Sequence, residues 1–143
     1  MNLAANPAVT NDDCPFCRIA AGLAPAHIVA EDEHCFAVLD TRPAARGHTL
    51  VIPRAHVTDL WSAEPETAAA LGRTCAAVAR QLRTRLSPDG LTMRQNNGEA
   101  SGQVVFHLHV HLVPRWHGDG NVGWPWPPPD DHDPHAMMRL LCD

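Results

Sequence analysis

The sequence predicts an α+β fold: an antiparallel sheet of about five strands packed against one long helix, with a short N-terminal helix before it. Three observations predict this class. Strand-like runs come first, a long segment with helical periodicity follows, and further strand-like runs come after it. This order differs from the strict strand–helix alternation that builds a parallel sheet. A length of 143 residues with 45% apolar residues suits one domain with its own core.

The first elements lie before residue 54. A short helix is expected over 13–22, because Pro15 fits a first helical turn and Gly22 a C-terminal stop. Three strands rich in β-branched and aliphatic residues follow, at 29–32, 35–39 and 48–52. Pro53 ends the third strand, since proline cannot donate to a sheet ladder.

A long helix is predicted from Ser62 to Leu86. Its apolar positions recur at intervals of four, three, four and four residues: Leu71, Cys75, Val78, Leu82 and Leu86. Ser62 is the expected N-cap, and Pro65 fits the first turn. Turn residues over 87–90 end the helix. A fourth strand is expected at 91–95 and a polar, glycine-containing loop at 96–102.

The run from Val104 to Val113 is the strongest strand candidate. Alternate side chains of a strand share a face, so three imidazoles would line one side: His107, His109 and His111. The other side would be wholly apolar and should pack on the long helix: Val104, Phe106, Leu108, Val110 and Leu112. In a regular strand, neighbouring imidazoles would be about 7 Å apart.

Several interpretations of this histidine strand compete. Histidines on a solvated sheet face are one. A metal site made of all three is excluded, because the outer pair would lie about 13 Å apart and zinc–nitrogen bonds are about 2 Å long. The third is nucleophilic or acid–base catalysis, for which neutral imidazole is suited near pH 7.

Charge and composition exclude several classes of protein. The 11 basic side chains are all Arg, and the net charge is −5. No general nucleic-acid-binding surface is expected, because such a surface is basic. Lys is absent, which excludes a P-loop lysine and a Schiff base to pyridoxal phosphate.

Domain organisation and location are also predicted. No apolar run approaches the roughly 18 residues of a membrane span, and the N-terminus lacks the pattern of a signal peptide. An odd number of cysteines without an export signal favours free thiols in a reducing cytoplasm. We expect three parts: a flexible arm over 1–13, a catalytic domain over 14–116 and a Pro/Trp-rich extension over 117–143.

A Cys-x-x-Cys motif occurs at the start of the domain. Cys14 and Cys17 are half of a zinc site, a redox pair or two buried thiols. A redox pair is expected in a thioredoxin-like βαβ context, which this sequence lacks.

Three blocks together resemble the histidine triad (HIT) family of nucleotide hydrolases and transferases. The run 107–113 is similar to the family signature, 40–43 with 47–56 to its N-terminal block, and 96–98 with 100–103 to its approach loop. The likeness extends from about Cys14 to Trp116. It implies a homodimeric enzyme that acts on the α-phosphate of a purine nucleotide through a nucleotidyl-histidine intermediate.

The resemblance also implies roles for residues. His109 would attack the phosphorus, His111 would hydrogen-bond the phosphate, and Asp40 would bind the ribose hydroxyls or merely end a strand in a turn. Gln103 and Asn96 would contact the phosphate or the leaving group, with backbone N–H donors near Gly102. The candidates for an apolar base pocket are Ile28, Phe36, Leu39 and Ile52.

A zinc site is implied by the bacterial members of the family. His56 and His107 would join Cys14 and Cys17 in a closed tetrahedral structural site, which would fix His107 and leave His109 for chemistry. The alternative is a pair of bare thiols.

Some features leave the substrate open. Val104 stands where some members have Ser or Thr, and Asn96 where others have Gln. Nucleoside phosphoramidase and dinucleoside polyphosphate hydrolase therefore both remain, beside a nucleotide-binding regulator with little turnover and a zinc-dependent interaction module. Three tryptophans either reach a partner's site or cover the core: Trp116, Trp124 and Trp126.

Overall fold

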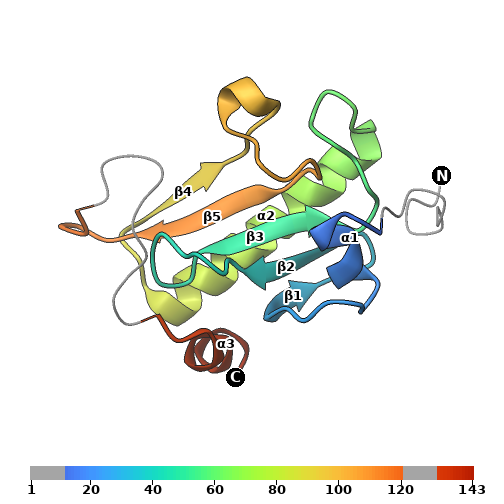
Figure 1. Cartoon of the computed structure of the whole chain (residues 1–143). Coiled ribbons are helices and arrows are strands. Elements are labelled where there is room, and N and C mark those ends of the chain that lie inside the picture. Colours follow the sequence, from blue (N-terminus) through green and yellow to red (C-terminus); the bar gives the residue numbers. More distant parts are fainter. Residues whose placement is uncertain (1–11, 121–131) are drawn as a thin grey trace.

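The computed structural model describes residues 12–120 and 132–143 and has the predicted α+β architecture (Figure 1). Five antiparallel strands form one sheet in the order β1-β2-β3-β5-β4. The elements in chain order are α1 Pro15–Ala20, β1 Ile28–Glu31, β2 Cys35–Leu39, β3 Thr49–Pro53, α2 Pro65–Leu86, β4 Gly90–Arg94, the 3₁₀ turn η3 Glu99–Ser101, β5 Val110–Arg115 and α3 Pro134–Cys142.

Helix α2 covers one face of the sheet (Figure 1). Four of its five predicted apolar positions are buried in the main core, and Leu86 packs at its edge. The strands contribute the side chains that alternate toward this helix, including Ala37, Val51, Val110 and Leu112. The helical and strand periodicities of the sequence therefore meet in one core.

The opposite face of β2 and β3 is covered by α1. Phe36, Val38, Leu50 and Ile52 pack there against Phe16 and Cys17 in a second apolar cluster. Because both faces are covered, every residue of β2 and β3 is buried. This explains why these strands are almost continuously apolar rather than alternating.

The start of α2 differs from the prediction. The N-cap is Glu64 rather than Ser62, and Pro65 occupies the first turn. The Ser62 hydroxyl instead hydrogen-bonds the carboxylate of Asp59 at 2.9 Å, in a turn before the helix. A local acceptor thus engages the side chain that was expected to cap the helix.

The predicted strand over 104–113 is only half formed. Residues 104–109 are irregular, and β5 begins at Val110. The expectation that Val104 and Phe106 pack on the long helix was wrong, since their exposed fractions are 84% and 48%. Pairing of β5 with β3 stops at the Val51–Val110 pair, although β3 runs on to Pro53, which has no N–H to donate to a further ladder bond.

The C-terminal residues contain a helix that the sequence analysis missed. Helix α3 is capped by the Asp133 side chain, which accepts from the N–H of Ala136, and it buries Leu141. Of the three tryptophans, Trp116 packs against Ala44, Ala45 and Val113, as the core-covering alternative expected. Trp124, Trp126 and nearly all of the predicted N-terminal arm lie outside the described residues. In the described ranges no helix is both long and apolar enough to cross a bilayer.

Candidate active site and metal centre

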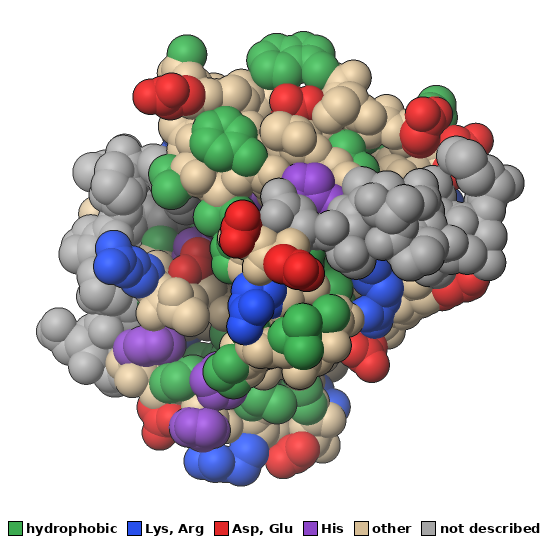
Figure 2. Space-filling view, turned by 45° about the vertical axis from the view of Figure 1, so that its right-hand side comes forward, with side chains coloured by type: hydrophobic (Ala, Val, Ile, Leu, Met, Phe, Trp, Pro, Cys, Tyr) green, Lys and Arg blue, Asp and Glu red, His purple; other side chains and the backbone are tan. Residues whose placement is uncertain are grey.

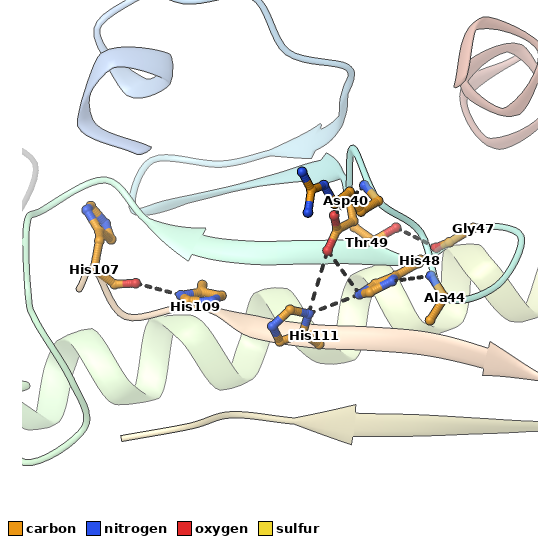
Figure 3. A network of polar contacts seen from close by, with 9 residues as sticks. Asp40, Ala44, Gly47, His48, Thr49, His107, His109 and His111 are labelled. Atoms are coloured by element: carbon orange, nitrogen blue, oxygen red, sulfur yellow. Dashed lines mark hydrogen bonds and ion pairs between the residues drawn. The ribbon is translucent and has the colours of Figure 1, made fainter. Parts of the chain in front are cut away.

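One hydrogen bond fixes the imidazole of His109. Its Nδ1 lies 2.6 Å from the backbone carbonyl oxygen of His107 (Figure 3). A carbonyl only accepts, so Nδ1 carries the proton and the lone pair of neutral His109 is on Nε2. This is the tautomer that a nucleophilic or basic histidine needs.

The irregular backbone before β5 makes that bond possible. In a paired strand, the carbonyls of the ladder bond to the neighbouring strand. Before Val110 the pairing with β3 has ended. The N–H of Leu108 bonds instead to the carbonyl of Val57, in the loop after β3, at 2.6 Å. This bond replaces the ladder bond that a strand would have made.

The His107 side chain engages another backbone acceptor of the same region. Its Nε2 donates to the carbonyl of Pro53, the last residue of β3, at 2.7 Å. The backbone carbonyl of His107 itself holds the ring of His109, two residues further along the chain.

A second network orients His111. The backbone N–H of Ala44 donates to Nδ1 of His48 at 2.9 Å, so neutral His48 carries its proton on Nε2. That Nε2 lies 3.0 Å from Nδ1 of His111 and 3.4 Å from the carboxylate of Asp40 (Figure 3). His48 therefore donates to His111, and His111 carries its own proton on Nε2. The two histidines of β5 and its approach thus adopt opposite tautomers: His109 offers a lone pair and His111 a proton.

Burial keeps these imidazoles neutral. It lowers the pKa of His48 to about 4 and that of His111 to about 3, where a charged His48 would also repel a charged His111. Burial likewise lowers the pKa of His109, opposed by its hydrogen bond to the His107 carbonyl. All three rings are consequently uncharged at neutral pH, as the tautomer assignment requires.

The rings of His109 and His111 are closer than a regular strand would place them. Their centroids are 5.2 Å apart and their planes are inclined by 64°. The expected spacing was about 7 Å, and the difference arises because His109 precedes the paired part of β5. Both rings can therefore address one phosphoryl group.

The side chains of Cys14, Cys17, His56 and His107 converge at the end of α1. Their ligand atoms all lie within 4.8 Å of one another. Cys14 Sγ is 3.3 Å from His107 Nδ1, and Cys17 Sγ is 3.2 Å from His56 Nδ1. The structure thus brings together the four predicted metal ligands from α1, the loop after β3 and the segment before β5.

The donor set fits zinc. Tetrahedral zinc with typical bond lengths separates sulfur and nitrogen ligands by about 3.6 Å, close to the distances observed. The Nε2–H of His107 donates to the Pro53 carbonyl. The Nδ1 of neutral His107 therefore carries the lone pair, and it faces the two sulfurs. Burial also lowers the pKa of His107 to about 4, which keeps that lone pair unprotonated at neutral pH.

The loop between β4 and β5 holds the remaining predicted contacts. The buried Gln103 side chain donates to the carbonyls of Thr58 and Val105 and accepts from the N–H of Gly98. The N–H of Gly102 is bonded to the carbonyl of Glu99, and its φ of +96° requires glycine. In this conformation Gln103 and Gly102 shape the loop, and their predicted contact with substrate stays a prediction, as does that of Asn96.

An apolar cavity of about 370 Å³ lies beside the histidines. Phe16, which lines it, also contacts the ring of His109 with centroids 5.1 Å apart. Asp40 lines the cavity too, with one carboxylate oxygen bonded to the N–H of Arg42 in a turn and the other toward His48. The lining residues are Phe16, Ile19, Pro25, Ala26, His27, Val38, Leu39, Asp40, Thr41 and Leu50.

The residues predicted for a base pocket lie only partly at this cavity. Only Leu39 of the four apolar candidates lines it. Phe36 and Ile52 are fully buried in the cluster beneath α1, and Ile28 packs at the edge of that cluster. Strand periodicity identifies a buried face, but it does not show which part of that face the covering helix leaves open.

The role of His48 was missed by the sequence analysis, which placed it only in a family block. Its partner His111 lies 63 positions away in the sequence, so no local pattern signals the contact. Asp40, His48 and His111 also form a group with metal-ligand spacing. Their hydrogen bonds account for that arrangement.

Known proteins resemble this chain over most of its length. Residues 21–118 match the HIT domain family. The chain belongs to the histidine triad family. It is 38% identical over 130 residues to the protein hit of Bacillus subtilis, covering 90% of each chain. A zinc-bound histidine triad family protein from Mycobacterium smegmatis is 42% identical over 90% of each chain, with a TM-score of 0.81.

Another relative in the family carries a named activity. The adenylylsulfatase HINT3 of Arabidopsis thaliana is 36% identical over 104 residues, which cover 73% of this chain and 53% of the relative. A histidine triad nucleotide-binding protein from Sulfolobus tokodaii is 33% identical, with a TM-score of 0.79 over 90% of this chain and 89% of that one.

Proposed function

We propose that this histidine triad protein is a nucleotide hydrolase or transferase that works through a nucleotidyl-histidine intermediate on His109. The observation that carries the proposal is the bond from His109 Nδ1 to the His107 carbonyl, which leaves the Nε2 lone pair for attack. Nε2 attacks the α-phosphorus, a nitrogen–phosphorus bond forms, and the bond to the leaving group breaks. Water or another acceptor then cleaves the nitrogen–phosphorus bond and restores His109.

His111 supports this chemistry as a donor. Its Nε2–H donates a hydrogen bond to the phosphoryl group, close to where the leaving group departs. His48 holds the His111 ring in this orientation. His107 contributes through its backbone carbonyl. The loop residues Gln103 and Asn96 and the backbone near Gly102 then contact the phosphate or the leaving group.

The cavity beside the triad takes the nucleoside. Its apolar walls suit a purine base, and Asp40 offers two acceptor oxygens to the ribose hydroxyls. Phe16 joins this cavity to His109, so a nucleoside bound there would present its 5′-phosphate to the nucleophile.

Zinc is the proposed structural ion of the Cys14, Cys17, His56 and His107 group. Bound there, zinc supplies a cross-link between α1, the loop after β3 and His107 rather than any step of the reaction. The zinc-bound relative supports the choice of metal.

Three leaving groups fit an attack at the α-phosphorus: an amine, a second nucleotide and sulfate. The first two correspond to nucleoside phosphoramidase and dinucleoside polyphosphate hydrolase. The third is suggested by the adenylylsulfatase relative. Phosphoramidase is the first of the three to test. There the amine leaves with a proton taken from water, while the N–H of neutral His111 donates a hydrogen bond at the site.

A homodimer and a cytoplasmic location complete the proposal. The edge strand β4 exposes Leu91 and Met93, with exposed fractions of 39% and 65%. An exposed apolar edge favours pairing with a second copy. Light scattering on the purified protein tests the dimer. On the face shown in Figure 2, basic and acidic side chains are interspersed. The absence of a nucleic-acid partner stays a prediction.

One assay tests the function. The wild type and His109→Ala are incubated with adenosine 5′-phosphoramidate, diadenosine polyphosphates and adenosine 5′-phosphosulfate. We expect AMP release from the phosphoramidate by the wild type alone. No turnover of any of the three substrates would refute the proposal in favour of a nucleotide-binding or zinc-dependent interaction protein. Equal activity of the variant would refute His109 as the nucleophile.

A further inference from the structure

The outer wall of the nucleoside cavity touches helix α3. His27, on the segment before β1, lines the cavity. Its ring makes an edge-to-face contact with the ring of His135 on α3, with centroids 4.8 Å apart and planes inclined by 83°. Figure 2 shows histidine side chains close together at the lower end of the molecule, the end at which α3 lies in Figure 1.

The backbone of His27 is fixed, but its ring depends on what packs against it. The carbonyl of His27 accepts from the N–H of Leu39, another lining residue of the cavity. The imidazole is only partly buried, and α3 supplies its aromatic contact. A change on α3 can therefore move the ring without changing the strand beneath it.

Helix α3 is anchored firmly enough to serve as such a support. Leu141 is 1% exposed in the main core, and the Gln81 amide donates to the carbonyls of both Leu141 and Val29. The first turn of α3 also borders a small hollow that Asp40 and His48 line from the other side. The helix thus reaches from the main core to the rim of the active site.

We propose that α3 contributes to nucleobase binding at this site: His135 positions the ring of His27, and His27 stacks against the base. That the ligand is a nucleotide rests on the proposed function, whereas the contact between His27 and His135 is observed independently of it. The helix lies outside the matched domain, residues 21–118, so it supports a lining residue of the cavity with a contact that the domain alone does not supply.

The experiment compares two ligands that share a ribose phosphate and differ in the base. Calorimetry on the full-length protein measures the binding of AMP and of ribose 5-phosphate to the wild type, His135→Ala and His135→Phe. We expect His135→Ala to weaken AMP binding about three- to tenfold, as for loss of an aromatic contact. Binding of ribose 5-phosphate should not change. His135→Phe should restore AMP binding, because it keeps the edge-to-face contact.

Leu140→Ala is the matched control, since Leu140 is exposed on the same helix. It should leave both affinities unchanged. Unchanged AMP binding in His135→Ala, an equal loss for both ligands, or no AMP binding by the wild type would overturn the inference. A wild type that binds AMP in this His135-dependent way but releases none from any tested substrate would refute the proposed function alone.

Discussion

The two halves of the histidine run differ in what holds their backbone. Residues 110–115 form β5, paired with β3 on one side and β4 on the other. Residues 104–109 have no such ladder, and the chain there is held by the Val57 carbonyl and the His107 side chain. Yet the apolar–histidine alternation runs through both halves without a break.

Because their surroundings differ, three histidines of one alternating pattern have different hydrogen-bond partners and different proposed roles. His111, on the paired half, is reached by a side chain from the neighbouring segment, His48. His109, on the unpaired half, is held by a carbonyl that a ladder would have used. The side chain of His107 points toward the thiols of Cys14 and Cys17, in the candidate metal site. Breaking each support separately shows whether the roles are independent.

The largest effect is expected at His109. The variant His109→Ala removes the proposed nucleophile, so phosphoramidate turnover should fall at least about 10,000-fold. Zinc content and thermal stability should stay close to those of the wild type, because neither depends on this ring. An activity assay, metal analysis and a thermal melt on the same preparation check this; residual activity within tenfold would show that His109 is not the nucleophile.

The next effect concerns the metal group. The double variant Cys14→Ala, Cys17→Ala should lose its zinc and about 4 kcal/mol of stability, through loss of ligand linkage. Metal analysis and denaturant unfolding measure both quantities. Cys142→Ser, at an exposed cysteine outside the group, is the control and should retain both. Unchanged zinc content in the double variant would refute the assignment.

A pH dependence follows from His48. Burial lowers its pKa from 6.5 to about 4, so the unfolded chain takes up a proton below pH 6.5 that the folded chain does not. The contribution of neutral His48 to the free energy of unfolding is fully present above pH 6.5. It falls by up to about 3 kcal/mol as the pH drops to 4. Urea unfolding of the wild type and His48→Asn across this range checks it. The wild type and the variant both keep the metal ligands, so any competition between protons and zinc cancels when their stabilities are subtracted. Identical pH profiles of the two proteins would contradict a buried, neutral His48.

The smallest effect separates the two bonds of His48. His48→Gln keeps a donor near the position of Nε2, while His48→Asn keeps an acceptor for the Ala44 N–H. Since the donor orients His111, we expect kcat to fall about 10- to 100-fold in the Asn variant and less in the Gln variant. Steady-state kinetics measures this. The reverse order would mean that the Ala44 bond, not the orientation of His111, is what matters.

Much of the fold was predictable because its elements carry local signals. The spacing of Leu71, Cys75, Val78 and Leu82 identified α2, and β2 and β3 were correct within one residue. Helix α3 also had signals that were overlooked: Asp133 as N-cap, Pro134 in the first turn, and Met137 and Leu141 four residues apart.

Other features depend on contacts between distant segments. Pairing between β3 and β5 stops at the Val51–Val110 pair, and the partner of His111 is His48, which lies directly before β3. Period-two alternation cannot report either one. The four candidate zinc ligands were predicted from the resemblance to the family, and the structure brings them together.

The proposed mechanism requires His109 Nε2 to form a covalent bond to phosphorus. Mass spectrometry of protein quenched with base during turnover of adenosine 5′-phosphoramidate tests this directly, with peptide mapping at alkaline pH to locate the adduct, because the nitrogen–phosphorus bond is labile in acid. The structure predicts an adenylyl group on the peptide at His109, absent from His109→Ala and retained in His111→Ala. Steady turnover with no adduct at any quench time, or an adduct on His111, would contradict it.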